Sequence, residues 1–397
     1  MSVSSDHTLS ELLGDVYSAS ILIVDDMLLM QKMIGQSLTN AGYNNLSYAS
    51  DGLEAVEAIE KKCPDLVILD LNMPKMSGYD VCRHVRANPD YSGLPILVQS
   101  AAESPKERTE VFNVGGTDFV SKPINQPELL ARVRMHLENK FLISNLTSFH
   151  DRVRMELEIA REMQQDILPS RAYLDTLSES CHVDIEAVYQ SSSELGGDLW
   201  GIWPLEKGKF GFFVLDVSGH GVGSALNTFR AHSAMAIMED LKEDPAAFLT
   251  ELNSKMVSDF PTGSFATMFY AVVDPKEGQV TFAGAGAPNP FIISQDGASQ
   301  RLDSSGYPIG IISSASYENL TASLKPGDLI FAYSDVFIEA PDDNGEFLGD
   351  AGLERVILDC HSQANDKNVI DIFIADFQKR VPGNLPDDLT AVGIYTG

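Results

Sequence analysis

The 397-residue chain lacks several features that would place it in familiar protein classes. It has no run of about 18 apolar residues, so we expect no segment that spans a membrane. Its first twenty residues hold no Lys or Arg and no sustained apolar stretch, so we expect no secretory signal. The four cysteines form no CxxC pair, which indicates free thiols and a cytoplasmic protein rather than a disulfide framework.

Positive charge is also scarce. The formal net charge is -29, and residues 169–397 hold 13 Lys and Arg against 33 Asp and Glu. Such a surface repels a phosphate backbone, so we expect no nucleic-acid partner. The hydrophobic content of 44% is that of an ordinary globular protein, and the length suits two domains with a connector.

Residues 20–126 alternate short runs rich in Val, Ile and Leu with helical patterns. Five such strand–helix pairs predict an α/β domain with a doubly wound parallel sheet. Polar residues follow the apolar runs, and they are Asp25, Asp26, Asp70, Ser100 and Lys122. Because the carboxyl ends of parallel strands meet at one edge of a sheet, we expect these side chains to converge.

These five residues suit the transfer of a phosphoryl group to a carboxylate. Three neighbouring carboxylates repel one another unless a cation lies among them, and Mg²⁺ prefers hard oxygen ligands. Lys122 can offset the negative charge that builds on a transferring group. The Asp25–Asp26 pair alone could be a solvated loop, but the ordered set of five favours a functional site.

This segment resembles the CheY-like receiver domains of response regulators, which have a flavodoxin-like fold. The resemblance implies that Asp70 accepts a phosphoryl group from a sensor histidine kinase or a phosphotransfer protein. It also implies a Mg²⁺ site formed by Asp25, Asp26, Asp70 and the backbone carbonyl of Asn72. By the same resemblance, Ser100 and Lys122 contact the phosphoryl oxygens, Phe119 is the switch aromatic, and the Lys122–Pro123 bond is cis.

Residues 127–168 contain no internal Gly or Pro and predict one helix of about 60 Å. A stripe with spacings of three and four follows a coiled-coil seam: Ile143, Leu146, His150, Val153, Leu157, Ala160, Gln164 and Ile167. We therefore expect a helical linker that pairs two copies of the chain, with a single helix lying on one domain as the alternative. Residues 1–19 are predicted to form a polar leader.

Residues 169–397 combine strand-like runs with helical runs, which predicts an α+β layered domain. The strand-like runs cover 183–189, 209–217, 265–273, 279–285, 328–334 and 389–395, and the helical runs cover 223–241, 245–258, 350–361 and 366–380. Four separated acidic motifs carry Asp198, Asp216, Asp335 and Asp387. Scattered Asp side chains that meet beside glycines can bind two hard cations, and such a pair can activate water for an in-line phosphoryl displacement.

This half resembles the metal-dependent protein phosphatases of the 2C type, in particular the SpoIIE/RsbU branch. The implied fold is a β-sandwich flanked by helices, and the implied reaction removes phosphate from phosphoserine or phosphothreonine with two Mn²⁺ or Mg²⁺ ions. The roles implied are a bridging Asp216 with the Val217 carbonyl as a ligand, Asp335 and Asp387 on the first metal, Asp388 as a second choice to Asp387, and Asp198 orienting a water. The implied substrate is a phosphorylated STAS-type anti-sigma-factor antagonist.

Three positions depart from that family's pattern. Gly201 stands where a second acid is usual, Val336 where Gly is usual, and Ala287 where His is usual. These departures motivate an alternative, in which the domain is an inactive phosphatase that acts as a regulated binding adaptor. His220 can be a proton donor or a structural residue.

Overall fold

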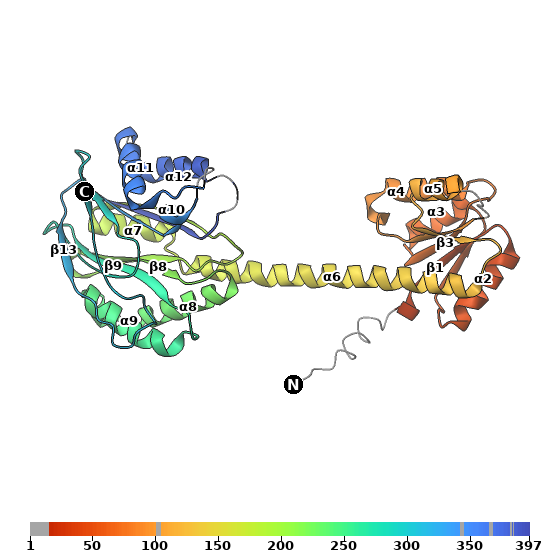
Figure 1. Cartoon of the computed structure of the whole chain (residues 1–397), viewed down its shortest axis with the longest axis horizontal. Coiled ribbons are helices and arrows are strands. Elements are labelled where there is room, and N and C mark those ends of the chain that lie inside the picture. The colour runs from red at the N-terminus through yellow and green to blue at the C-terminus, as the bar shows by residue number, and fades with distance from the viewer. Residues whose placement is uncertain (1–15, 101–104, 342–344, 365–367, 382, 384) are drawn as a thin grey trace. The chain divides into compact units, whose positions relative to one another are not determined.

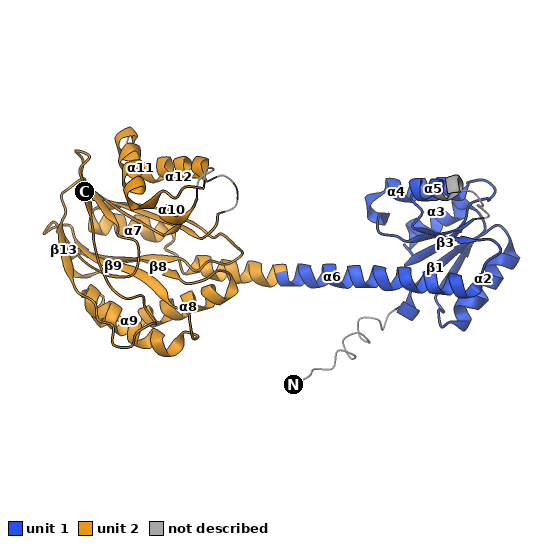
Figure 2. Cartoon of the chain, in the orientation of Figure 1, with its two compact units in different colours: residues 1–153 blue, residues 154–397 orange. Residues whose placement is uncertain are grey.

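The computed structural model describes residues 16–100, 105–341, 345–364, 368–381, 383 and 385–397. The chain divides into two compact units, residues 1–153 and 154–397 (Figure 1; Figure 2). The division falls within one continuous helix, α6 (Gln126–Asp166), which begins in the first unit and ends in the second. Within the described ranges, no helix has the length and apolar character needed to cross a membrane.

The first unit is a five-stranded parallel sheet in the order β2-β1-β3-β4-β5, with helices on both faces (Figure 1). The doubly wound fold predicted from the sequence is confirmed. Its elements are η1 (Val16–Ser18), β1 (Ile21–Val24), α2 (Leu28–Asn40), β2 (Leu46–Ala49), α3 (Gly52–Lys61), β3 (Leu66–Asp70), α4 (Gly78–Ala87), η2 (Pro89–Tyr91), β4 (Ile96–Ser100), α5 (Pro105–Asn113) and β5 (Asp118–Ser121).

The first turns of α6 complete this unit. Leu129, Val133 and Leu137 recur every four residues on one helix face, and all three are fully buried in the core that β1 and α2 also line. Val16 and Ala19, which precede β1, are buried in the same core. Residues 1–15 of the predicted leader lie outside the described residues.

The second unit contains two five-stranded antiparallel sheets, in the orders β13-β10-β9-β8-β7 and β12-β11-β14-β15-β6. Its strands are β6 (Val183–Gln190), β7 (Leu199–Pro204), β8 (Phe210–Val217), β9 (Ala266–Asp274), β10 (Gln279–Ala285), β11 (Phe291–Ile293), β12 (Ser299–Arg301), β13 (Leu320–Ser323), β14 (Leu329–Tyr333) and β15 (Leu389–Thr396). Its helices are α7 (Arg171–Cys181), η3 (Glu206–Gly208), α8 (Val222–Ala236), η4 (Glu239–Leu241), α9 (Pro245–Asp259), α10 (Val336–Glu339), α11 (Gly349–Gln363) and α12 (Val369–Arg380).

Three apolar cores hold these layers together. The central core joins side chains of both sheets, such as Phe212 on β8 and Ile394 on β15. One outer core packs α8 and α9 against the first sheet, and the other packs α11 and α12 against the second. The β-sandwich flanked by helices is therefore confirmed (Figure 1).

The end of α6 belongs to the second unit rather than to a free coiled-coil seam. Gln164 is buried, and Ile167, just beyond the helix, packs on the core that contains α9. Gln164 and Ile167, the last two positions of the predicted seam, therefore make contacts within the second unit. Their spacing suits packing against a domain as well as packing against a second helix. Apolar side chains further back, including Leu146 and Ile159, remain exposed.

Candidate functional site

The polar residues of the first unit meet at the carboxyl edge of its sheet. One carboxylate oxygen from each of Asp25, Asp26 and Asp70 lies within 4.8 Å of the others, the only such acidic group among the described residues. Lys122 Nζ lies 2.7 Å from Asp70 Oδ2 and 3.6 Å from Asp25 Oδ2. Ser100 is buried at the end of β4, and its carbonyl accepts a 2.8 Å hydrogen bond from the Lys122 amide.

Asp25 is the most enclosed member of this cluster. Its Oδ1 accepts a 2.9 Å hydrogen bond from the Met27 amide, whereas its buried Oδ2 accepts none. Burial raises the pKa of the Asp25 carboxyl, while the Met27 amide and Lys122 oppose the rise. A buried carboxylate oxygen without a hydrogen bond, in an all-oxygen cluster, fits a small hard cation such as Mg²⁺.

The remaining predicted residues lie around this cluster. Asn72 is exposed, and its amide donates a 3.4 Å hydrogen bond to Asp70 Oδ1. The Lys122–Pro123 bond is cis, as predicted. Phe119 is half-buried, and the Arg132 guanidinium of α6 lies 5.8 Å from the centre of its ring.

Arg132 also ties α6 to β5. Its Nη1 donates to both Asp118 oxygens, at 2.7 and 2.6 Å, and His136 Nε2 lies 3.0 Å from the same carboxylate. Hydrogen bonds from His136 and Arg132 lower the pKa of Asp118 against the opposing effect of burial. Sequence reasoning missed this contact, although the spacing of Arg132 and His136 places both on one helix face.

Four loops and strand ends carry the acidic residues of the second unit. Asp198 precedes β7, Asp216 lies near the end of β8, Asp335 follows β14, and Asp387 precedes β15. Pairing of β14 with β15 brings the last two motifs together, and Thr390 N donates a 2.9 Å hydrogen bond to Ser334 Oγ. Thr390 Oγ1 also donates a 2.6 Å bond to Asp198 Oδ2, so three motifs meet at one place.

The loop between Asp216 and α8 depends on glycine. Gly219 and Gly221 have φ values of 90° and 79°, which L side chains rarely adopt. Gly221 is the residue before α8, so the chain turns sharply from β8 into this helix. The turn keeps Asp216 and His220 at one end of the sandwich. Burial raises the pKa of Asp387, and the nearby His220 opposes the rise.

Asp388 differs from its neighbour Asp387. It is buried, and its Oδ2 accepts hydrogen bonds from Gly197 N at 2.5 Å and Asp198 N at 3.4 Å. Its Oδ1 accepts from Ser192 N at 2.7 Å. Both oxygens therefore hold the loop that carries Asp198.

Burial and mutual repulsion dominate the electrostatics of these acids. Burial raises the pKa of Asp198 well above its usual value, and Asp216 adds to the rise. Burial and the charge of Asp335 raise the pKa of Asp216 to about 7. Burial and the charge of Glu339 raise the pKa of Asp335 to about 6. Within the described residues, no basic side chain is among the groups that shift the pKa values of Asp198, Asp216 and Asp335.

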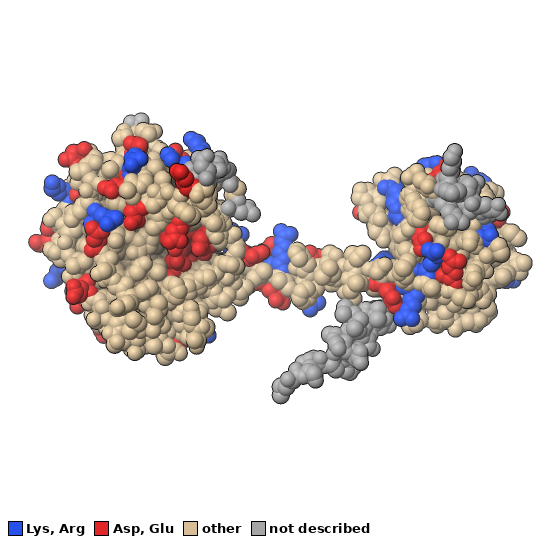
Figure 3. Space-filling model, viewed as in Figure 1, with Lys and Arg blue, Asp and Glu red and all other residues tan. Residues whose placement is uncertain are grey.

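Glu339 is not among the site residues predicted from the sequence, although its charge raises the pKa of Asp335. It ends the single turn of α10, four residues after Asp335, and this spacing could have placed it near the site. Acidic side chains also cover more of the visible face of this unit than basic ones do (Figure 3). The donor set is all oxygen, negatively charged and partly desolvated, which fits hard divalent cations.

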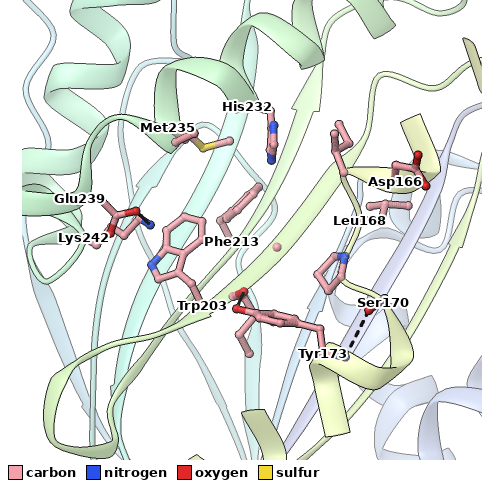
Figure 4. Close-up of a pocket in the computed structure, with 15 residues that line it drawn as sticks. Asp166, Leu168, Ser170, Tyr173, Trp203, Phe213, His232, Met235, Glu239 and Lys242 are labelled. Atoms are coloured by element: carbon pink, nitrogen blue, oxygen red, sulfur yellow. Dashed lines mark hydrogen bonds and ion pairs between the residues drawn. The ribbon is translucent and has the colours of Figure 1, made fainter. Parts of the chain in front are cut away.

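A cavity of about 430 Å³ lies elsewhere in the second unit, and none of the four candidate Asp residues lines it. Trp203, Phe213 and His232 line one side, and the turn after α6, from Asp166 to Ser170, lines another (Figure 4). Lys242 Nζ lies 4.7 Å from the centre of the Trp203 ring. The cavity is therefore separate from the acidic site.

Comparison with known proteins agrees with both halves of this description. The family model described as the response regulator receiver domain matches residues 21–134, and the model described as stage II sporulation protein E (SpoIIE) matches residues 206–396. The chain therefore contains a receiver domain of the response-regulator type, followed by a domain of the SpoIIE type. The first unit is accordingly called the receiver domain below, and the second unit is called the phosphatase domain.

Individual relatives cover parts of the chain. The transcriptional regulatory protein YvrH of Bacillus subtilis (strain 168) is 38% identical over 138 residues, which cover 34% of this chain and 57% of that protein. The response regulator MprA of Mycobacterium sp. (strain KMS) is 41% identical over 114 residues, or 29% of this chain and 48% of that protein. The chain therefore spans about half the length of these curated relatives.

A solved structure matches the phosphatase domain. The SiaA-PP2C domain of Pseudomonas aeruginosa superposes with a TM-score of 0.55 and 24% identity, covering 62% of this chain and 98% of that one. At this identity, the match concerns the fold. The sequence-based assignment of both domain families is confirmed.

Proposed function

We propose that the phosphatase domain hydrolyses phosphoserine or phosphothreonine on a partner protein and that phosphorylation of Asp70 controls this activity. The observation that carries the proposal is the convergence of four acidic motifs at one end of the sandwich. There, Thr390 donates a hydrogen bond to Asp198, and the charges of Asp335 and Asp387 help burial to raise the pKa of Asp216. Catalysis by two metal ions requires such a set of oxygen ligands.

Asp216, Asp335, Asp387 and the Val217 carbonyl would hold the two Mn²⁺ or Mg²⁺ ions. The bound ions would supply an activated water and neutralise charge on the phosphoryl group. Asp198, held by Thr390, would orient the attacking water. Asp388 is assigned to positioning rather than to metal binding, because backbone amides occupy its two oxygens.

In the receiver domain, Asp70 would accept the phosphoryl group from a sensor histidine kinase or a phosphotransfer protein. Asp25, Asp26, Asp70 and the Asn72 carbonyl would hold Mg²⁺, Ser100 and Lys122 would contact the phosphoryl oxygens, and Phe119 would report the modification. The 2.7 Å contact between Lys122 and Asp70 supports this assignment, because a positive charge there stabilises a transferring phosphoryl group.

The partner of the phosphatase domain would be a phosphorylated STAS-type anti-sigma-factor antagonist. Two copies of the chain would pair through α6, whose exposed apolar side chains supply a surface for a second helix. Sedimentation of the full chain with and without beryllofluoride tests this pairing. The same sedimentation profile at every concentration, corresponding to one chain, would exclude it.

Turnover of a phosphoserine protein by the full chain tests the main proposal. We expect hydrolysis with Mn²⁺, none with EDTA, and a loss of at least about a hundredfold in Asp216→Asn. Asp240→Asn, which changes an exposed acid on η4, serves as the matched control. Tight binding of the partner without any metal-dependent turnover would favour the adaptor alternative, which the departures at Gly201, Val336 and Ala287 motivate.

A further inference from the structure

The last turn of α6 touches the loop that carries Asp198. Gln164 is 3% exposed, and its side chain makes two hydrogen bonds to one residue, Gly196. Its Nε2 donates to the Gly196 carbonyl oxygen at 2.7 Å, and its Oε1 accepts from the Gly196 amide at 3.0 Å. Two bonds from one planar amide fix the orientation of this loop as well as its distance from the helix.

The other side of the same loop is held rigidly. Asp388 accepts from the amides of Gly197 and Asp198, and Thr228 Oγ1 donates a 2.7 Å bond to the Gly197 carbonyl. A Cβ atom on Gly196 would lie 2.7 Å from Asp388 Oδ2 and still closer to the Tyr189 hydroxyl. The loop is therefore bonded to α6 on one side and to Asp388 and Thr228 on the other, so a shift of Gln164 either moves the loop against these bonds or breaks the two bonds to Gly196.

The contact of α6 with this domain is concentrated at Gln164. Among residues 154–166, it is the one buried residue, and the others are exposed or half-buried. Residues 166–170, which follow Gln164 closely in the chain, line the 430 Å³ cavity (Figure 4). Incomplete packing beside that turn leaves room for the end of the helix to shift.

We propose that Gln164 is a positioning residue of the hydrolytic site, through which a displacement of α6 moves the Gly196–Asp198 loop. Gln164 does not reach the reacting groups and acts through Gly196 and the loop to Asp198. The inference rests on the proposed phosphatase function for its catalytic consequence. The mechanical part, that Gln164 holds the loop in place, can be measured without any substrate.

Hydrogen–deuterium exchange of residues 192–199 in the full chain measures the mechanical part. Gln164→Met keeps the length of the side chain and removes both hydrogen bonds, whereas Gln164→Glu keeps an acceptor for the Gly196 amide. We expect exchange about tenfold faster in Gln164→Met and an intermediate rate in Gln164→Glu. Gln165→Met, at the exposed neighbouring position, is the matched control and should exchange like the unsubstituted chain.

Kinetics with a phosphoserine protein and Mn²⁺ measure the catalytic part. We expect kcat to fall about tenfold or more in Gln164→Met with KM within about twofold, because the loop positions groups rather than binding substrate. Beryllofluoride should change the exchange of residues 192–199 in the unsubstituted chain and have no such effect in Gln164→Met.

Unchanged loop exchange in both Gln164 variants, or an equal change in Gln165→Met, would overturn the inference. So would a beryllofluoride response of Gln164→Met equal to that of the unsubstituted chain. Circular dichroism shows whether each variant is folded, and Gln164→Glu replaces Gln164→Met if the latter unfolds. If no chain hydrolyses phosphoserine, the proposed function fails, while the exchange rates still decide the role of Gln164.

Discussion

The two domains each gather carboxylates at the end of a sheet, but they differ in the charge that accompanies them. In the receiver domain, Lys122 lies within 4.0 Å of two of the three acids, and the three carboxylates approach within 4.8 Å of one another. In the phosphatase domain, Asp216 and Asp335 experience mainly burial and the charges of other acids. A site with its own cation can hold its carboxylates close together, whereas the second site depends on ions that it must bind.

The largest effect should come from Asp70→Asn, which removes the carboxylate that lies nearer to Lys122, at 2.7 Å against 3.6 Å for Asp25. We expect loss of phosphoryl transfer from a small donor such as acetyl phosphate, because an amide cannot accept the phosphoryl group that the Asp70 carboxylate would accept. Intact-protein mass spectrometry measures the added phosphoryl group. Asp90→Asn, on an exposed 3₁₀ turn of the same domain, is the control, and labelling retained in Asp70→Asn would refute the assignment.

The second effect concerns ion binding in the phosphatase domain. Mn²⁺ at about a hundred times its dissociation constant should stabilise this domain by about 2.7 kcal/mol for each bound ion. Calorimetry of the full chain should show a transition that rises with Mn²⁺ in Asp26→Asn but much less in Asp216→Asn. If the rise were lost in Asp26→Asn and retained in Asp216→Asn, it would belong to the receiver domain, and the contrast between the sites would fail.

The third effect is the pH dependence without metal. The pKa of Asp216 is raised from 3.8 to about 7 and that of Asp335 to about 6, chiefly by burial, so the folded domain binds more protons than the unfolded chain between these values. Stability should therefore be highest near pH 4 and fall as the pH rises through about 7. We expect the transition of this domain in EDTA to fall by about 4 °C or more between pH 5 and pH 7.5.

Asp216→Asn should flatten this pH dependence and raise the metal-free transition at pH 7.5, because a neutral amide is not repelled by Asp335. Saturating Mn²⁺ should remove it in the unsubstituted chain, since bound ions hold the carboxylates ionised. A metal-free transition temperature that rises over this pH range would show that the acids are not repelling one another.

The sequence predicted the receiver site well because one rule covers it. Side chains after parallel strands meet at one edge, so the sequence alone places Asp25, Asp70 and Lys122 together. The phosphatase domain has no such rule, because its acids come from antiparallel strands and loops far apart in sequence. Their motifs could be recognised by resemblance, but their contacts could not be derived from spacing.

Several strands and residue roles of the phosphatase domain could not be predicted from the sequence, for local reasons. Strand β7 contains a glycine and ends at a proline, and β11 and β12 have only three residues each, so none shows a strong period-two pattern. Asp387 and Asp388 look alike in sequence, and only the loop amides around Asp388 separate their roles. Gln164 fitted a coiled-coil seam because the spacing that faces a second helix also faces a domain.

The smallest expected effect concerns two ion pairs formed by α6, one partly buried and one exposed. Arg132 donates two hydrogen bonds to Asp118, and the Arg132 side chain is 31% exposed. Arg154 pairs with Glu158 on the same helix, with side chains 71% and 61% exposed. Arg132→Met should destabilise the receiver domain by about 2 kcal/mol, because the Asp118 carboxylate then loses two hydrogen bonds and keeps only His136 and the Phe119 amide.

Arg154→Met is the matched control and should change stability by less than about 0.5 kcal/mol, since water screens an exposed pair. Urea denaturation of the receiver transition measures both values. The effect of Arg132→Met should shrink as the pH falls, because the lowered pKa of Asp118 means that its stabilising charge is lost only in acid. Equal effects of the two substitutions would show that burial does not set the value of an ion pair in this domain, and the contrast between the two acidic sites would then need another cause.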